Sequence, residues 1–217
     1  MKDHLTILID MDDTIEYLLK EWLDYLNSVY HTNVTEDDIH EYDITRAFPD
    51  LEPNQVYQPL FDPELWKRVK PVPGARYAIE RLQQDGHDVY IVTSSNYSTI
   101  YVKIDAILHR YFPTIDDAHV IIARKKQMIR GDVMVDDAPH NLVGGEYLKI
   151  MPTAAHNRDF NEYECGIIRV NDWDDIYDTI HEYAEFTSAM EDLYDTIHEY
   201  AEFTSAMERD SNGRQNQ

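Results

Sequence analysis

The chain has 217 residues, 43% hydrophobic and 12% aromatic, which suits a globular protein with one buried domain or a domain carrying an insertion. Its net charge of -23 repels nucleic-acid backbone and anionic lipid, so duplex nucleic acid and membranes are poor partners. A phosphate site must therefore be made locally positive by a cation, lysines or amides. The single cysteine, Cys165, excludes an internal disulfide, and no run approaches the ~20 apolar residues of a membrane span, so we expect a cytoplasmic protein.

Short apolar runs alternate with helical patterns along the chain. The first run, at 5–9, is rich in β-branched residues and ends in Asp10, which predicts a buried parallel strand. Similar runs follow at 88–92, 120–123, 132–135, 148–151 and 166–170, with helical periodicity at 75–84 and 98–110. This alternation predicts an α/β fold built on a three-layer, Rossmann-like parallel sheet.

A stretch after the first strand interrupts this rhythm. Apolar residues recur at helical spacing from Ile15 to Val29, and a segment rich in proline and aromatic residues then extends to about residue 72. We therefore expect residues 16–72 to form a small helical cap, inserted into a core made of residues 1–15 and 73–174.

Residues 175–217 are expected to form a C-terminal helix with a duplicated segment and a disordered tail. The sequence YDTIHEYAEFTSAME occupies 177–191 and recurs 17 residues later at 194–208. At about 100° per residue, this offset falls roughly 100° short of five full turns, so the two apolar stripes face different directions in one straight helix. One copy should pack on the core while the other projects, frays or meets a partner. A recent duplication without a functional role is the simpler interpretation.

Carboxylates gather where the first strand ends, in Asp10-Met11-Asp12-Asp13-Thr14. Open α/β sheets bind ligands at the edge formed by the carboxyl ends of their strands. Asp10 and Asp12 can both reach one site there, and clustered carboxylates take up protons unless a cation lies between them. Hard oxygen ligands on a short loop suit Mg²⁺. Because the chain has 42 acidic residues, this motif also arises by chance and does not decide the function alone.

Three further strand ends carry groups that a phosphate site needs. Thr93 ends the second strand with a hydroxyl that can hold phosphate oxygens, although an ordinary turn is the commoner origin of such a residue. Lys126 follows the third strand and can neutralise a carboxylate and a phosphate, with Lys125 as a competing residue. Asp136 and Asp137 end the fourth. The order carboxylate, hydroxyl, amine and carboxylate favours a phosphate site over chance.

These four motifs resemble those of the haloacid dehalogenase-like phosphotransferases over roughly residues 5–172. The resemblance implies that Asp10 attacks phosphorus and forms an aspartyl-phosphate, while Asp12 protonates the leaving oxygen and then activates water. It also implies that Thr93 holds the phosphoryl group and that Lys126 balances charge.

The same resemblance implies a Mg²⁺ site. Its ligands would be Asp10, the backbone carbonyl of Asp12, and one member of the pair Asp136 and Asp137, of which we favour Asp137. Oligomers are common in this superfamily, which leaves a homodimer as an open expectation.

A narrower resemblance is to the 5'(3')-deoxyribonucleotidase family. It rests on the DMDDT opening, the cap after the first motif, Thr93-Ser94, and Arg124-x-Lys126 nine residues before a Val-Asp-Asp. The family removes phosphate from deoxyribonucleoside monophosphates, and the resemblance places Ser94 and Arg124 near the phosphate or sugar.

The cap of this family encloses the nucleoside. Leu18 lies where some relatives carry a base-stacking aromatic, and we expect it to contact the substrate. Three other large side chains of the cap either enclose the nucleoside or form the core of the cap: Trp22, Phe48 and Trp66. We favour the second role for most of them. Asp13 stands where many members have glycine and adds charge near the metal.

Two alternatives remain open at this point. One is a phosphatase of the same superfamily that acts on another small ester, such as a sugar phosphate. The other is a non-catalytic binding protein on this fold, with the acidic C-terminal helix as its working surface. The complete motif set favours an enzyme.

Overall fold

The structure of the chain, a computed structural model, describes residues 4–215, with side chains described as far as Thr204. Its centre is a six-stranded sheet in which all neighbouring strands are parallel, in the order β3-β2-β1-β4-β5-β6. The strands are β1 (Thr6–Ile9), β2 (Asp88–Thr93), β3 (Val120–Ile122), β4 (Val133–Val135), β5 (Leu148–Pro152) and β6 (Ile167–Val170). The predicted α/β fold is therefore confirmed.

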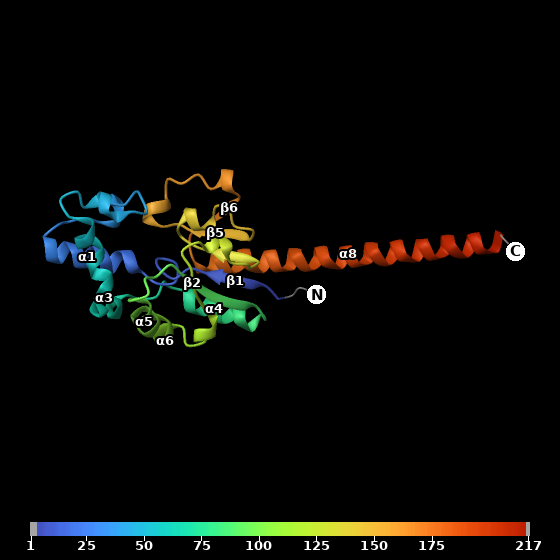
Figure 1. The fold of residues 1–217 in the computed structure, drawn as a ribbon, viewed down its shortest axis with the longest axis horizontal. Coiled ribbons are helices and arrows are strands. Elements are labelled where there is room, and N and C mark those ends of the chain that lie inside the picture. Colours follow the sequence, from blue (N-terminus) through green and yellow to red (C-terminus); the bar gives the residue numbers. More distant parts are fainter. Residues whose placement is uncertain (1–3, 216–217) are drawn as a thin grey trace.

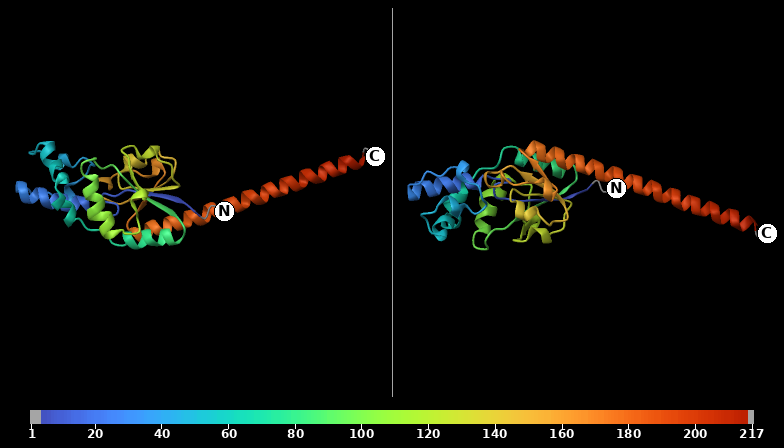
Figure 2. Two further views of the ribbon diagram at one scale, coloured as in Figure 1. Left: turned by 60° about the horizontal axis from the view of Figure 1, so that its bottom comes forward. Right: turned by 90° about the horizontal axis from the view of Figure 1, so that it is seen from above.

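The central strand β1 is buried on both faces because its side chains alternate between two hydrophobic clusters. Ile7 and Ile9 pack in the larger cluster with α4 (Ala75–Gln84) and the first part of α8 (Trp173–Gln215). Leu8 packs in the smaller cluster on the other face, with Leu142 of α7 (Pro139–Leu142). Helices thus lie on both faces of the sheet, which gives three layers (Figures 1 and 2).

The chain between β1 and α4 forms a helical region beside the sheet (Figure 1). It contains α1 (Leu18–Tyr30), α2 (Pro53–Tyr57), α3 (Pro63–Arg68) and the 3₁₀ turns Glu36–Asp38, Ile44–Ala47 and Gln58–Phe61. Prolines occupy the first turns of α2 and α3, where their missing N–H costs nothing. The two connections to the core run side by side, since the Tyr17 amide donates to the Lys70 carbonyl at 2.9 Å and the Val72 amide to the Ile15 carbonyl at 2.8 Å.

A helix of three short parts follows β2. It consists of α5 (Ile100–Lys103), a π-helical turn (Ile104–Leu108) and α6 (His109–Tyr111). Ile107 and Leu108 of this segment are buried in the larger cluster. The segment also lies against α3 of the helical region, and it therefore brings polar residues of its first turn to the edge of the sheet.

The last helix, α8, has 43 residues and extends far beyond the sheet (Figure 1). Ile176 and Ile180 of its first half are buried against the core, whereas the equivalent residues of the second copy, Leu193 and Ile197, are 52% and 58% exposed. α8 continues past the repeat to Gln215, where a disordered tail was expected, and Asn216 and Gln217 lie outside the described residues. Among the helices described, none is both long and apolar enough to cross a membrane.

Candidate active site

Three central strands end side by side at one edge of the sheet, and each delivers a polar side chain there. Asp10 follows β1, Thr93 ends β2, and Asp136 follows β4. The Asp10 amide still donates to the Val135 carbonyl at 2.8 Å, so the ladder between β1 and β4 holds the start of the first motif in place. All three side chains are nearly inaccessible to solvent.

Lys126 lies between two of these carboxylates. Its ammonium donates to Asp10 Oδ1 and, at 2.6 Å, to Asp136 Oδ2. Burial opposes the charge on Lys126, but the two carboxylates outweigh it and raise the pKa of the lysine. The neighbouring Lys125 is exposed, so the structure places Lys126 and not its neighbour at the site.

The other oxygen of Asp136 is also occupied. It accepts from the Ala138 amide at 2.9 Å and from Asn141 Nδ2 at 3.0 Å. Asp136 therefore acts as an anchor that holds Lys126 and the start of α7. Asp137 has no such set of donors on its carboxylate, apart from His156 Nε2 at 3.3 Å from Oδ2.

Asp10, Asp136 and Asp137 can together hold a divalent metal ion. One carboxylate oxygen from each lies within 4.8 Å of the others, and this is the group of metal-ligating side chains found among residues 4–215. Burial, followed by the nearby carboxylates, raises the pKa of Asp137 well above its usual range. Burial also raises the pKa of Asp10, to about 7, although Lys126 opposes the shift. The cluster carries more negative charge than Lys126 neutralises, and hard carboxylate oxygens are the donors that a cation such as Mg²⁺ prefers.

A second buried lysine lies on the other side of the site, where the sequence analysis had assigned nothing. Lys103 of α5 is 1% exposed, and its ammonium donates to Asp12 Oδ2 at 2.7 Å, Ser95 Oγ at 2.6 Å and Thr93 Oγ1 at 3.1 Å. Burial alone would raise the pKa of Asp12, but the positive charge of Lys103 holds it below its usual value. Asp12 is therefore ionised in this arrangement.

One sequence signal could have identified Lys103. It lies three residues after Ile100 and four residues before Ile107, both of which are buried, so it occupies the apolar face of its helix. A lysine at such a position is buried only when it is paired. Thr93 was predicted to hold the phosphoryl group; its hydroxyl contacts Lys103 and Ser95 and is not among the groups that line the open pocket.

Asp13 stabilises the start of α1, a role that was not predicted from the sequence. Its backbone adopts the left-handed conformation, with φ of 54°, which is the conformation that favours glycine. Aspartate tolerates it better than most residues, and here its carboxylate accepts from the Leu19 amide at 2.9 Å in the first turn of α1. The same side chain borders the pocket, and burial raises its pKa to about 7.

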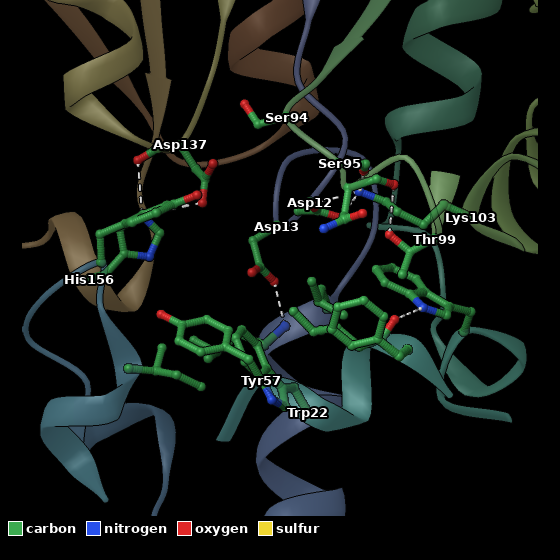
Figure 3. Close-up of a pocket in the computed structure, with 18 of the residues that line it drawn as sticks. Asp12, Asp13, Trp22, Tyr57, Ser94, Ser95, Thr99, Lys103, Asp137 and His156 are labelled. Atoms are coloured by element: carbon green, nitrogen blue, oxygen red, sulfur yellow. Dashed lines mark hydrogen bonds and ion pairs between the residues drawn. The ribbon is translucent and has the colours of Figure 1, made fainter. Parts of the chain in front are cut away.

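A pocket of about 410 Å³ opens between the sheet edge and the helices of residues 18–68. Asp137 and His156 lie on one side, Lys103 and Ser95 on the other, and Trp22 and Tyr57 face them from the helical region (Figure 3). The lining is charged at the sheet edge and apolar to aromatic beneath it.

The two indole rings of the pocket are held by hydrogen bonds to the backbone. The indole nitrogens donate to carbonyls, Trp22 to Val56 at 2.7 Å and Trp66 to Leu60 at 2.9 Å. Lys103 Nζ lies 5.1 Å from the centre of the Trp66 ring, a cation–π contact that joins the helical region to the sheet edge.

Some of the residues that the sequence predicts to contact the substrate line the pocket, and others lie in the core. Leu18, Ser94 and Arg124 line the pocket. Ser94 donates to the Ala123 carbonyl at 3.1 Å, whereas Arg124 is exposed at the rim. Trp22 and Trp66 line the pocket although they are largely buried, and Phe48 is a core residue of the helical region.

His156 and its neighbour Asn157 also lie at the site, although their positions in the sequence did not predict this. They follow β5, and Asn157 Nδ2 donates to the Asp137 carbonyl at 2.7 Å, while His156 contacts both that carbonyl and the Asp137 carboxylate. Burial lowers the pKa of His156, so the ring is neutral and adds no positive charge beside Asp137. Both lie in a 3₁₀ turn, Ala155–Asn157, shortly after the end of a strand that the sequence predicts, and this position was the signal for both.

Known proteins similar to this chain identify the family to which it belongs. The chain matches, over residues 4–186, the family model described as "5' nucleotidase, deoxy (Pyrimidine), cytosolic type C protein". It is 33% identical to a 5'(3')-deoxyribonucleotidase of Bacillus subtilis over 172 residues, or 78% of this chain and 95% of that protein. A 5'(3')-deoxyribonucleotidase of Clostridium acetobutylicum is 29% identical over 168 residues, which cover 77% of this chain and 90% of the relative.

Solved structures show the same fold at lower sequence identity. A haloacid dehalogenase-like protein of Agrobacterium tumefaciens superposes with a TM-score of 0.58 at 13% identity, covering 84% of this chain and 99% of that one. A putative phosphoglycolate phosphatase of Lactobacillus delbrueckii superposes with a TM-score of 0.59 at 15% identity, covering 81% and 97% of the two chains. The resemblance to haloacid dehalogenase-like hydrolases is confirmed, and the chain belongs to the deoxyribonucleotidase family, whose members are nucleotide phosphatases.

Proposed function

We propose that this chain is a Mg²⁺-dependent phosphomonoesterase that hydrolyses deoxyribonucleoside monophosphates through an aspartyl-phosphate on Asp10. The observation that carries the proposal is the arrangement of Asp10 and Lys126 in a buried carboxylate cluster beside a pocket with aromatic walls. Relatives named 5'(3')-deoxyribonucleotidase support the choice of substrate. Residues 16–72 act in this proposal as a cap over the site.

The first chemical step belongs to Asp10. Its carboxylate oxygen forms a bond to phosphorus while the bond from phosphorus to the ester oxygen breaks, and Asp12 gives a proton to the departing nucleoside. Asp12 is ionised in this structure, but an anionic phosphate beside it raises its pKa and so favours the proton that this step requires. Lys103 holds the Asp12 carboxylate in place.

The second step regenerates Asp10. Asp12, now ionised and stabilised in that state by Lys103, takes a proton from water, whose oxygen forms a bond to phosphorus. The bond from phosphorus to the Asp10 oxygen breaks at the same step, which releases inorganic phosphate and frees the Asp10 carboxylate. In this proposal Ser94 and Arg124 orient the phosphoryl oxygens, and the Thr93 hydroxyl supports the site from behind through Ser95 and Lys103. Lys126 neutralises the charge on Asp10 and on the phosphoryl group.

Mg²⁺ would be held by Asp10, by the backbone carbonyl of Asp12 and by Asp137. Asp136 is less suited to direct contact because Lys126, Ala138 and Asn141 already occupy its oxygens. The bound cation supplies positive charge to the transferring phosphoryl group.

The apolar part of the pocket supports a nucleoside as the leaving group. Leu18, Trp22, Tyr57 and Trp66 line it, and aromatic walls of this kind stack on planar bases. A sugar phosphate would leave these surfaces without a matching partner. The free Cys165 fits the reducing, cytoplasmic setting that belongs to the same proposal.

Phosphate release from a panel of nucleotides and sugar phosphates, with and without Mg²⁺, tests the proposal. We expect fast Mg²⁺-dependent release from deoxyribonucleoside monophosphates, and its loss in Asp10→Asn. Release from sugar phosphates alone would keep the chemistry and refute the substrate. The absence of release from every ester would instead favour a binding protein on this fold.

A further inference from the structure

The part of α8 from residue 191 to residue 203 buries none of its side chains in the described structure. Every residue from 191 to 203 is exposed, and the helix projects away from the sheet in all three views of Figures 1 and 2. Isolated helices of this length are marginal in water, because most helical stability in proteins comes from packing an apolar face. This segment therefore requires a surface to pack against.

The exposed segment carries an apolar stripe with the spacing of a coiled coil. Five large apolar residues alternate at intervals of four and three, which is the a/d pattern of a heptad repeat. They are Phe186, Met190, Leu193, Ile197 and Tyr200, each at least 49% exposed. At about 100° per residue, all five lie within roughly 40° of one line along the helix. Such a stripe fits a second helix of the same kind.

The charges in this segment point to what that second helix is. The positions that flank the stripe are all uncharged: Thr187, Ala189, Tyr194, Thr196, Ala201 and Phe203. The acidic residues fall on the remaining positions, away from the stripe: Glu191, Asp192, Asp195, Glu199 and Glu202. A basic partner that packed on the stripe would not reach the acidic residues, because they lie on the opposite side of the helix. Two identical helices can instead pack along the stripe without bringing carboxylates together.

This contact is compatible with the attachment of α8 to its own domain. Ile176 and Ile180, which pack on the core, lie on a different face of the helix from the stripe, as the 17-residue offset requires. The family model ends at residue 186, so the stripe lies almost wholly outside the part shared with the relatives. Association through it would leave the catalytic pocket open.

We infer that the projecting half of α8 pairs with the same segment of a second copy of this chain, through the stripe from Phe186 to Tyr200. Sedimentation equilibrium of the full chain across micromolar concentrations tests this inference. The expected result is a mass that rises toward twice the 25.6 kDa of the monomer. A mass of 25.6 kDa at every concentration would overturn it.

A matched pair of substitutions locates the contact. Ile197→Glu puts a carboxylate into the centre of the seam and should weaken association at least about 100-fold, because two charges would lose water without a partner. His198→Glu adds the same side chain one residue later, outside the stripe, and should leave the mass of the dimer unchanged. Both positions are exposed in the monomer, so neither change should unfold the domain, and circular dichroism verifies this. Equal association of the two variants would refute the assignment.

Discussion

The two buried lysines of the site show how differently one residue type can be used. Lys126 faces two carboxylates, Asp10 and Asp136, with the carboxylate of Asp137 close by. Lys103 faces one carboxylate, Asp12, and two hydroxyls. The carboxylates on the Lys126 side can together hold a metal ion, whereas on the Lys103 side the charge of the lysine holds the pKa of Asp12 below its usual value. The partners of each lysine therefore separate the part of the site that suits a cation from the part that suits proton transfer.

Removing Lys126 should have the largest effect. In Lys126→Met, Asp10 and Asp136 lose their shared cation, and we expect kcat to fall by about 10³-fold or more. Unfolding should also become easier, by roughly 3–5 kcal/mol, because buried carboxylates lose their partner. Lys125→Met, at the exposed neighbour, is the control and should change neither value. Equal behaviour of the two variants in phosphate release and thermal denaturation would contradict this role.

Removing Lys103 should have a smaller and more specific effect. In Lys103→Met we expect kcat to fall by about 10²-fold, within the range that positioned acid–base groups contribute. The pKa of Asp12 should rise, because the charge that lowers it is gone. The acidic limb of the profile of kcat against pH should therefore move to higher pH. A profile that keeps its midpoint in this variant would show that Lys103 does not control Asp12.

Neutralising Asp137 should weaken the binding of Mg²⁺ more than it lowers kcat. Asp137→Asn removes one oxygen anion from the cluster, and we expect the Mg²⁺ concentration for half-maximal activity to rise at least about tenfold. Activity at saturating Mg²⁺ should recover in part. An unchanged Mg²⁺ requirement would contradict the assignment of Asp137 and favour Asp136 as the direct ligand.

The last prediction concerns the stability of the protein in the absence of metal. The pKa of Asp10 is raised to about 7, above its unfolded value, so the folded state loses stability as pH rises between these values. Asp10→Asn removes this cost, which is at most roughly 4 kcal/mol. With a chelator present, we expect the variant to have a higher Tm than the parent at pH 7.5 and a smaller advantage at pH 5. If Asp10→Asn has a lower Tm than the parent at pH 7.5, an excess of negative charge around Lys126 is refuted.

Sequence patterns predicted the strands and their polar ends because both depend on local order along the chain. Parallel strands bring their carboxyl ends together, and Asp10, Thr93 and Asp136 follow from that rule. Lys103 could not be placed in the same way, since it comes from a helix and reaches Asp12 only after α5 has packed against the sheet. The role of Asp13 in starting α1 likewise depends on one backbone angle that its neighbours in sequence do not reveal.

The paired connections between the sheet and residues 18–68 have a mechanical consequence. Because the segments around Glu16 and Pro71 are bridged as antiparallel neighbours, the helical region is joined to the sheet at one ribbon and not at two separate points. A rigid rotation about that ribbon would separate Trp66 from Lys103 and Arg158 from the Glu36 carbonyl, which now lie together. It would leave Lys126 between Asp10 and Asp136 unchanged. The contacts of Lys126 with Asp10 and Asp136 therefore do not depend on those that join the helical region to Lys103 and Arg158.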